Sequence, residues 1–165
     1  MQAWRKNLRN ALVSGSMASV ASTAVLAACG KAETGSPFAA TNAISHWYWG
    51  EPAMRRDAPS WKHTAFGYAT HHGASVFWAF LYETCCGARR ARNAQAANLA
   101  DGMATAAVAC FVDYQLTPAR FMPGYERRLS KPALLAVYVG FGAGLAAGAM
   151  LLNRAADEPT LRQAR

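Results

Sequence analysis

Three ionisable side chains that could do chemistry lie inside stretches that are otherwise apolar. His71 and His72 are near the middle of residues 64–82, which carry no Asp, Glu, Lys or Arg, and Asp113 lies in a later apolar stretch. Ionisable groups inside a membrane-spanning helix are costly and usually face the bundle interior or a water-filled cavity. The three could therefore relay a proton or bind a metal ion. Transition-metal sites normally collect three or four ligands, so an interhelical hydrogen bond to Asp113 is the simpler interpretation.

Two further acids, Glu83 and Asp101, lie where apolar stretches end. Three arginines, at positions 89, 90 and 92, are within reach of one short loop. Long basic side chains near the ends of membrane helices commonly neutralise such acids, so we expect salt bridges here. The candidate intramembrane polar cluster consists of His71, His72, Asp113, Glu83 and Asp101.

Patterns typical of enzymes and cofactor sites are missing from the chain. It has no Ser/His/Asp order, no Gly-rich phosphate loop and no paired carboxylates, and its four cysteines have neither zinc spacing nor a disulfide framework. The net charge of +8 would suit a nucleic-acid-binding protein. However, the basic residues cluster at the ends of apolar stretches and form no groove interleaved with aromatic residues. We expect a protein that is not an enzyme, with no cofactor, no metal and no nucleic-acid partner.

Four helices must position these side chains. Residues 10–30, 64–82 and 132–153 are uncharged, and about 20 residues suffice for a helix to cross a bilayer core. A fourth stretch, 93–119, is interrupted by two aspartates. The pattern predicts one all-α membrane domain over residues 1–165, a polytopic bundle of four transmembrane helices. Its spans are expected at about 10–29, 64–84, 96–117 and 132–152.

Basic residues and aromatic residues set the expected orientation. Residues 89–92 hold three arginines, whereas the outer loop 30–63 spreads four basic residues along its length. The positive-inside rule then places both termini in the cytoplasm, although four basic residues in the loop 118–131 oppose it. Within the outer loop, residues 39–49 end in Trp-Tyr-Trp, and such rings favour the headgroup boundary. We therefore predict a short aromatic helix at the outer membrane interface.

Glycines in the last apolar stretch predict close helix packing. Gly140, Gly144 and Gly148 recur every four residues, as in a glycine zipper, and stripes of small residues let helix backbones approach closely in lipid. One expected partner is a small-residue stripe of the first span, formed by Ala11, Gly15, Ser19, Thr23 and Ala27. The alternative is the last helix of a second copy, which would give a homo-oligomer.

Cys29 permits two interpretations of the first apolar stretch. Residues 26–29, Leu-Ala-Ala-Cys, have the form of a lipobox, in which a signal peptide is cleaved and the cysteine carries lipid. The uncharged run 10–30 is longer than the 7–15 residues typical of a signal-peptide core and is long enough to span a bilayer. We therefore expect residues 1–28 to remain and Cys29 to be unmodified, with a lipoprotein acylated at Cys29 as the alternative.

Three strings together carry a resemblance to a known group of proteins. They are ATNAISHWYWGE, GYATHHGASVFWAFLYE and VDYQLTPARFMPGYERRLS. Over roughly residues 35–152 the chain resembles small inner-membrane proteins of proteobacteria that have four spans and no assigned activity. The resemblance implies a multi-pass protein of the bacterial inner membrane. We expect a non-enzymatic structural or accessory role in the envelope. The alternative is a small transporter, or a proton- or metal-handling protein, that uses His71, His72 and Asp113.

Overall fold

Four long α-helices form the body of the protein. The computed structural model describes residues 2–90 and 95–163, and the side chains of residues 2–87 and 95–155. The long helices are α1 (Gln2–Thr34), α4 (Phe66–Arg90), α5 (Gln95–Phe111) and α6 (Lys131–Gln163). No strand occurs in the described residues, and the predicted all-α class is confirmed.

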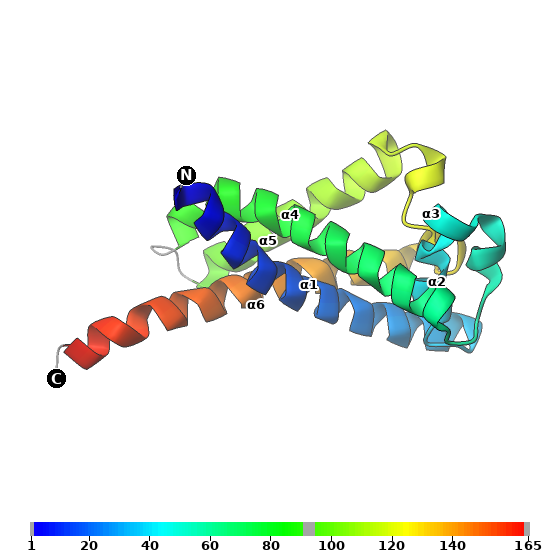
Figure 1. Ribbon diagram of the computed structural model, residues 1–165, viewed down its shortest axis with the longest axis horizontal. Helices are drawn as coiled ribbons and strands as arrows, with labels where there is room; N and C mark the ends of the chain where they lie inside the picture. Colours follow the sequence, from blue (N-terminus) through cyan, green and yellow to red (C-terminus); the bar gives the residue numbers. More distant parts are fainter. Residues whose placement is uncertain (1, 91–94, 164–165) are drawn as a thin grey trace.

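Short helical turns gather at one end of the bundle, opposite the two chain termini (Figure 1). They are α2 (Ala39–Ile44), α3 (His46–Trp49), the 3₁₀ turns η1 (Glu51–Arg55), η4 (Ala119–Phe121) and η5 (Tyr125–Arg127), and the π-helical turns η2 (Trp61–Ala65) and η3 (Val112–Leu116). We call residues 35–65 and 117–130 the cap. The turn η2 leads into α4, and η3 prolongs α5. Single π-turns of this kind occur frequently at functional sites.

The long helices are not evenly packed against one another. Helix α1 lies along both α4 and α6, and α5 lies along α6. In contrast, α4 and α5 have few contacts, and Figure 1 shows α5 leaning away from α4 towards the cap. The bundle is therefore tight on the α1–α6 side and open on the α4–α5 side.

Two helices are long and apolar enough to cross a membrane: α1 and the Lys131–Ala155 part of α6. The predicted spans 64–84 and 96–117 correspond to α4 and to α5 with η3, but neither reaches the same standard of length and hydropathy. One reason is that α5 has 17 residues, fewer than the roughly 20 of a typical span. A second is that α4 and α5 carry polar residues on their inner faces.

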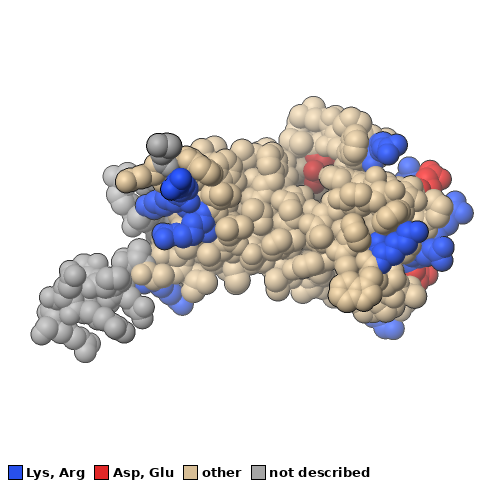
Figure 2. Space-filling view, in the orientation of Figure 1, with Lys and Arg blue, Asp and Glu red and all other residues tan. Residues whose placement is uncertain are grey.

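Basic residues lie at the two ends of the bundle. On the face in view, Figure 2 shows Lys and Arg gathered at both ends with a belt free of them between. One end carries Arg5, Lys6 and Arg9 near the start of α1, and the cap carries six basic residues, among them Arg55 and Arg56. This segregation follows from the three uncharged runs of the sequence, because their helices lie side by side.

The glycines of α6 lie directly against α1. A Cβ atom added at Gly144 would lie 2.5 Å from the Cα of Ala18, and one at Gly148 would overlap the Cα of Ser14. At Gly140 the nearest atom would be a methyl carbon of Val25, at 3.0 Å. We call this contact the α1–α6 seam. Because α1 of the same chain covers the glycine face, a second copy has no room there.

The residues of α1 at this seam differ from those that were predicted. The seam uses Ser14, Ala18 and Ser22, one position away from the predicted stripe. A member of that stripe, Gly15, faces α4 instead, where an added Cβ would lie 2.7 Å from the Cα of Val76. Neighbouring residues of a helix point about 100° apart, so α1 presents one small-residue face to each of two partners.

The aromatic outer segment is not the single interfacial helix that was predicted over residues 39–49. It forms two helices, and all six residues of α2 are buried. A Cβ at Gly67 of α4 would collide with the carbonyl oxygen of Thr41, so α2 is pressed against the α4 backbone. Only α3 exposes aromatic rings, those of Tyr48 and Trp49. The prediction failed because the alanines of α2 pack against other parts of the chain, and these contacts outweigh the preference of the following Trp and Tyr rings for the headgroup boundary.

Candidate functional site

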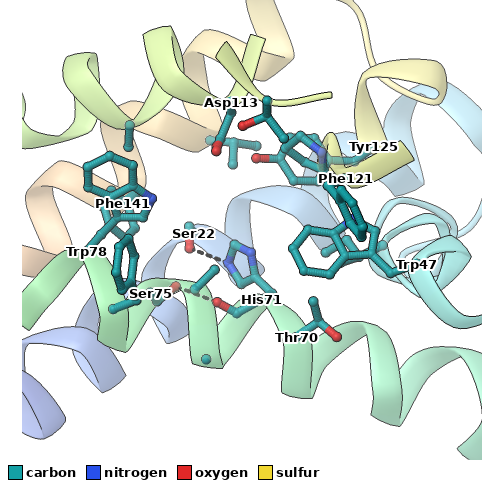
Figure 3. Close-up of a pocket in the computed structure, with 18 of the residues that line it drawn as sticks. Ser22, Trp47, Thr70, His71, Ser75, Trp78, Asp113, Phe121, Tyr125 and Phe141 are labelled. Atoms are coloured by element: carbon teal, nitrogen blue, oxygen red, sulfur yellow. Dashed lines mark hydrogen bonds between the residues drawn. The ribbon is translucent and has the colours of Figure 1, made fainter. Parts of the chain in front are cut away.

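A cavity of about 750 Å³ lies where α4 and α5 separate, next to the cap. Its walls come from α4, the end of α5 with η3, α6, α3 and the connector that holds η4 and η5. Figure 3 shows His71 and Asp113 on opposite sides of it, with the rings of Trp47, Phe121 and Tyr125 at one end and those of Trp78 and Phe141 at the other. The cavity thus combines aromatic walls with two ionisable side chains.

His71 is held on the α4 side by α1. Its Nε2 atom lies 2.8 Å from the hydroxyl oxygen of Ser22, which itself donates to the carbonyl oxygen of Ala18 at 2.7 Å. With the single Ser22 proton assigned to the Ala18 carbonyl, the Ser22 oxygen accepts from His71, and the neutral imidazole is assigned its proton on Nε2. The Nδ1 atom then has a free lone pair, and it has no hydrogen-bond partner among the described residues. His71 therefore offers the cavity an acceptor.

Asp113 lies in the π-turn η3 on the opposite side. Its Oδ2 atom accepts a hydrogen bond of 2.7 Å from the hydroxyl of Tyr138 on α6, and that hydroxyl accepts one of 3.3 Å from Tyr125. Within the described part of the chain, Asp113 makes no ion pair with a basic residue. The carboxylate is oriented by one donor and faces the cavity without a counter-charge.

The predicted hydrogen bond between the histidine pair and Asp113 is not formed. His71 contacts Ser22 and Asp113 contacts Tyr138, as described above. His72 is not part of the cavity wall: its ring stacks against Tyr68 with centroids 5.8 Å apart, and its buried Nδ1 has no partner. Adjacent residues of a helix point in different directions, so only one of the two histidines can face the cavity. Among the described residues, no three His, Cys, Asp or Glu side chains are grouped closely enough to hold a metal ion.

Glu83 and Asp101 do not belong to this site. Glu83 is 1% exposed and accepts a hydrogen bond of 3.0 Å from Ser14, far from the cap. Asp101 lies in α5, where its backbone carbonyl accepts from the Thr105 hydroxyl at 2.9 Å. Their expected partners, the arginines at 89, 90 and 92, fall outside the residues whose side chains are described. The five residues of the predicted polar cluster are thus spread along the bundle, and only His71 and Asp113 share a cavity.

Sequence reasoning missed the hydrogen-bond partners of the site. Ser22 belongs to a serine- and alanine-rich stretch in which no single serine stands out. Tyr138 did carry a signal, because it is the only tyrosine within the uncharged residues 132–153. A lone hydroxyl inside a span usually finds an interhelical partner, and Asp113 is an acid that needs one.

Aromatic contacts join the two segments of the cap. The indole N–H of Trp47 in α3 donates to the carbonyl oxygen of Met122 at 2.9 Å, and its ring meets that of Phe121 edge-to-face at 5.7 Å. This link closes one end of the cavity. Trp47, expected at the lipid headgroups, is instead a wall residue.

Cys29 lies within the unbroken helix α1. Its thiol is free and partly buried, and it packs against a cluster that includes Leu26, Ile44 and Leu129. The side chain thus has a packing partner in the bundle.

A comparison of the chain with protein-family models, curated proteins and solved structures found no match.

Proposed function

We propose that the chain is an integral protein of a bacterial inner membrane in which α1, α4, α5 and α6 all cross the bilayer. Both termini face the cytoplasm, and the role is structural or accessory rather than enzymatic. The observation that carries the proposal is the belt free of basic residues between the two charged ends of the bundle. A bilayer core of about 30 Å requires such a belt, because charged side chains there are costly.

The burial of polar groups supports spans at α4 and α5, although their hydropathy is lower. Ser75, Glu83 and Asn98 are each 2% exposed or less, whereas Phe77, Val108 and Phe111 are each more than half exposed. Polar residues of a membrane bundle face inward and apolar residues face lipid. A hydropathy average counts both faces and therefore understates how apolar the outer face is.

The packing of α1 supports its retention in the mature protein. Its serines at 14, 19 and 22 are fully buried, and it contacts α4, α6 and α2. Removal of residues 1–28 would expose the glycine face of α6 and the facing surface of α4. We therefore expect an intact mass that includes residues 1–28, and a mass matching an acylated chain that begins at Cys29 would contradict this part of the proposal.

One labelling experiment separates four spans from two. If only α1 and α6 cross, residues 91–94, between α4 and α5 in the sequence, lie on the outer side; if all four helices cross, these residues lie in the cytoplasm. In a variant without the native cysteines, Asn93→Cys should resist a membrane-impermeant maleimide in spheroplasts and react after lysis. Glu51→Cys in the cap is the matched control and should react without lysis. Labelling of Asn93→Cys in intact spheroplasts would refute the four-span topology.

A small transporter or solute-binding protein is a second candidate, favoured by the cavity that His71 and Asp113 share. It differs from the first candidate in requiring a saturable ligand. His72 has no place in it, because its ring lies outside the cavity wall.

A further inference from the structure

We infer that the cavity between α4 and η3 binds a lipophilic organic cation, a molecule with an apolar body and an ammonium-type head. The inference deepens the second candidate function and depends on the proposed membrane location only for the route of entry. Three features carry it: the aromatic walls, the unpaired Asp113 carboxylate and the hydrogen-bonding character of the polar wall groups.

The walls fit an apolar or aromatic body. Nine of the wall residues are Phe, Tyr or Trp, among them Trp47, Trp78, Phe121 and Phe141. A cavity of about 750 Å³ lies within the range of small-molecule sites, which are mostly apolar with a few oriented polar groups. Aromatic faces also attract cations, most strongly where water is excluded.

The polar groups of the wall favour a ligand that donates hydrogen bonds. The hydroxyls of Ser75 and Thr70 donate to helix carbonyl oxygens, at 2.8 Å each, and Tyr138 donates to Asp113. The acceptors that remain for a ligand are the lone pair of His71 Nδ1 and the Asp113 carboxylate. The indole N–H of Trp78 and the hydroxyl of Tyr48 are uncharged donors on the wall. No Lys or Arg of the described residues lines the cavity, so a cationic head would supply the missing counter-charge.

The rim of the cavity is apolar. Phe66, Phe77 and Phe121 line it and are each about half exposed. In the proposed orientation α4 crosses the bilayer, so a lipophilic molecule can enter sideways past Phe77.

Three probes with the same body test the head group. The purified full chain in phosphatidylcholine nanodiscs is titrated with radiolabelled 6-phenylhexylammonium, and with the uncharged 6-phenylhexanol and the anionic 6-phenylhexanoate as competitors. Partition into lipid is removed by subtracting the binding to nanodiscs without protein, and Gly73→Phe is the variant with an obstructed cavity. Gly73 is a wall residue whose added Cβ would meet nothing within 4 Å, so a phenylalanine there is expected to take up part of the cavity. Val108→Phe, on an exposed face outside the cavity wall, is the matched control.

We expect saturable binding of the ammonium probe to the native chain and to Val108→Phe, and none to Gly73→Phe. Asp113→Asn should weaken binding of the ammonium probe about tenfold, which is about 1.4 kcal/mol, and leave binding of the alcohol unchanged, because a hydrogen bond between two charged groups is stronger than one to a neutral group. If Asp113→Asn does not fold, the affinities of the three probes for the native chain test the inference, and the ammonium probe should bind most tightly. Equal binding of all three, or binding that Gly73→Phe does not reduce, means partition only and overturns the inference, as does preference for the carboxylate. Probe binding does not depend on the number of membrane spans. The four-span proposal can therefore fail while the inference stands, and the inference can fail while the four-span proposal stands.

Discussion

The α1–α6 seam and the cavity between α4 and η3 lie side by side in one bundle and follow opposite packing rules. At the seam, Gly144 and Ala18 bring two backbones together so closely that a single added carbon would clash. At the cavity, Trp78 and Phe141 stand between helices that have few direct contacts. The comparison teaches that small residues fix helix positions here, and that the space left between fixed helices is where large side chains and polar groups can form a site.

The cavity exists because α4 and α5 are each held elsewhere. Helix α4 is pressed to α1 at Gly15 and to α2 at Gly67, and α5 is pressed to α6, where an added Cβ at Gly102 would lie 2.5 Å from the carbonyl oxygen of Gly142. Each close contact is made at a glycine, and the three glycines belong to different helices. The two helices therefore diverge, and packing forces between them are too weak to close the gap.

Isoleucine at a seam glycine and at a cavity glycine should give the largest contrast. Gly144→Ile forces a branched side chain against the Ala18 backbone, and overpacking of this kind costs about 3 kcal/mol or more, since neither backbone can move alone. Gly73→Ile should be tolerated, because its Cβ meets open space. The unfolding midpoints of the two variants are measured by thermal unfolding in detergent. Equal midpoints for the two variants would show that the seam does not hold the bundle together. A substitution at Leu145, the residue next to Gly144, would not serve as a control, because the Leu145 side chain is fully buried.

The cap should be the next most sensitive region, because it holds α4 at the mouth of the cavity. Asn42 is fully buried, donates to the carbonyl oxygens of Arg56 and Ala58 at 2.9 and 3.0 Å, and accepts from Thr64 at 2.7 Å. Asn42→Ala removes three hydrogen bonds worth about 1 kcal/mol each, so we expect a loss of about 2–3 kcal/mol in the free energy of unfolding. An unchanged free energy of unfolding would mean that the cap is not coupled to the bundle. Glu51→Ala, at an exposed site of the cap, is the control.

A smaller effect is expected inside the cavity wall. Tyr138→Phe and Asp113→Asn should be coupled in a double-mutant cycle by about 0.6 kcal/mol, the average for interhelical hydrogen bonds in membranes, because the two side chains bond at 2.7 Å. His72→Ala with Asp113→Asn is the matched control and should be additive. Coupling in the control cycle, or its absence between Tyr138 and Asp113, would contradict the assigned hydrogen-bond network.

The smallest effect concerns the pH dependence of the cap. Burial, Lys62 and Arg56 together lower the pKa of His63 below 6.5, and its Nδ1 lies 3.1 Å from the Ser45 hydroxyl. Folding therefore favours the neutral ring. The contribution of His63 to stability is full above pH 6.5 and is lost as the pH falls through the lowered pKa of the folded state. Unfolding measured between pH 7.5 and 5 should show a slightly smaller slope for His63→Gln, and an identical slope would argue against the shift.

The sequence alone determined the class of the fold and the distribution of charge. Uncharged runs of about 20 residues, broken by clusters of Arg and Lys, predict long helices with charged ends whatever their neighbours are, because length and polarity are local properties. The close approach at Gly140, Gly144 and Gly148 also follows from local spacing, since glycines four apart always share one face.

Only the tertiary structure decided which faces meet and which polar groups pair. The rotation of α1 assigns Ser14, Ala18 and Ser22 to α6 and directs Gly15 to α4. The same rotation brings Ser22 within hydrogen-bond distance of His71. Because α4 diverges from α5, Asp113 bonds to Tyr138 of α6 and not to a histidine of α4. Helix periodicity fixes which residues share a face, but the choice of partner for each face depends on all the helices packing at once. For the same reason α2 is buried between α4 and the rest of the cap, although its sequence carries no long apolar run.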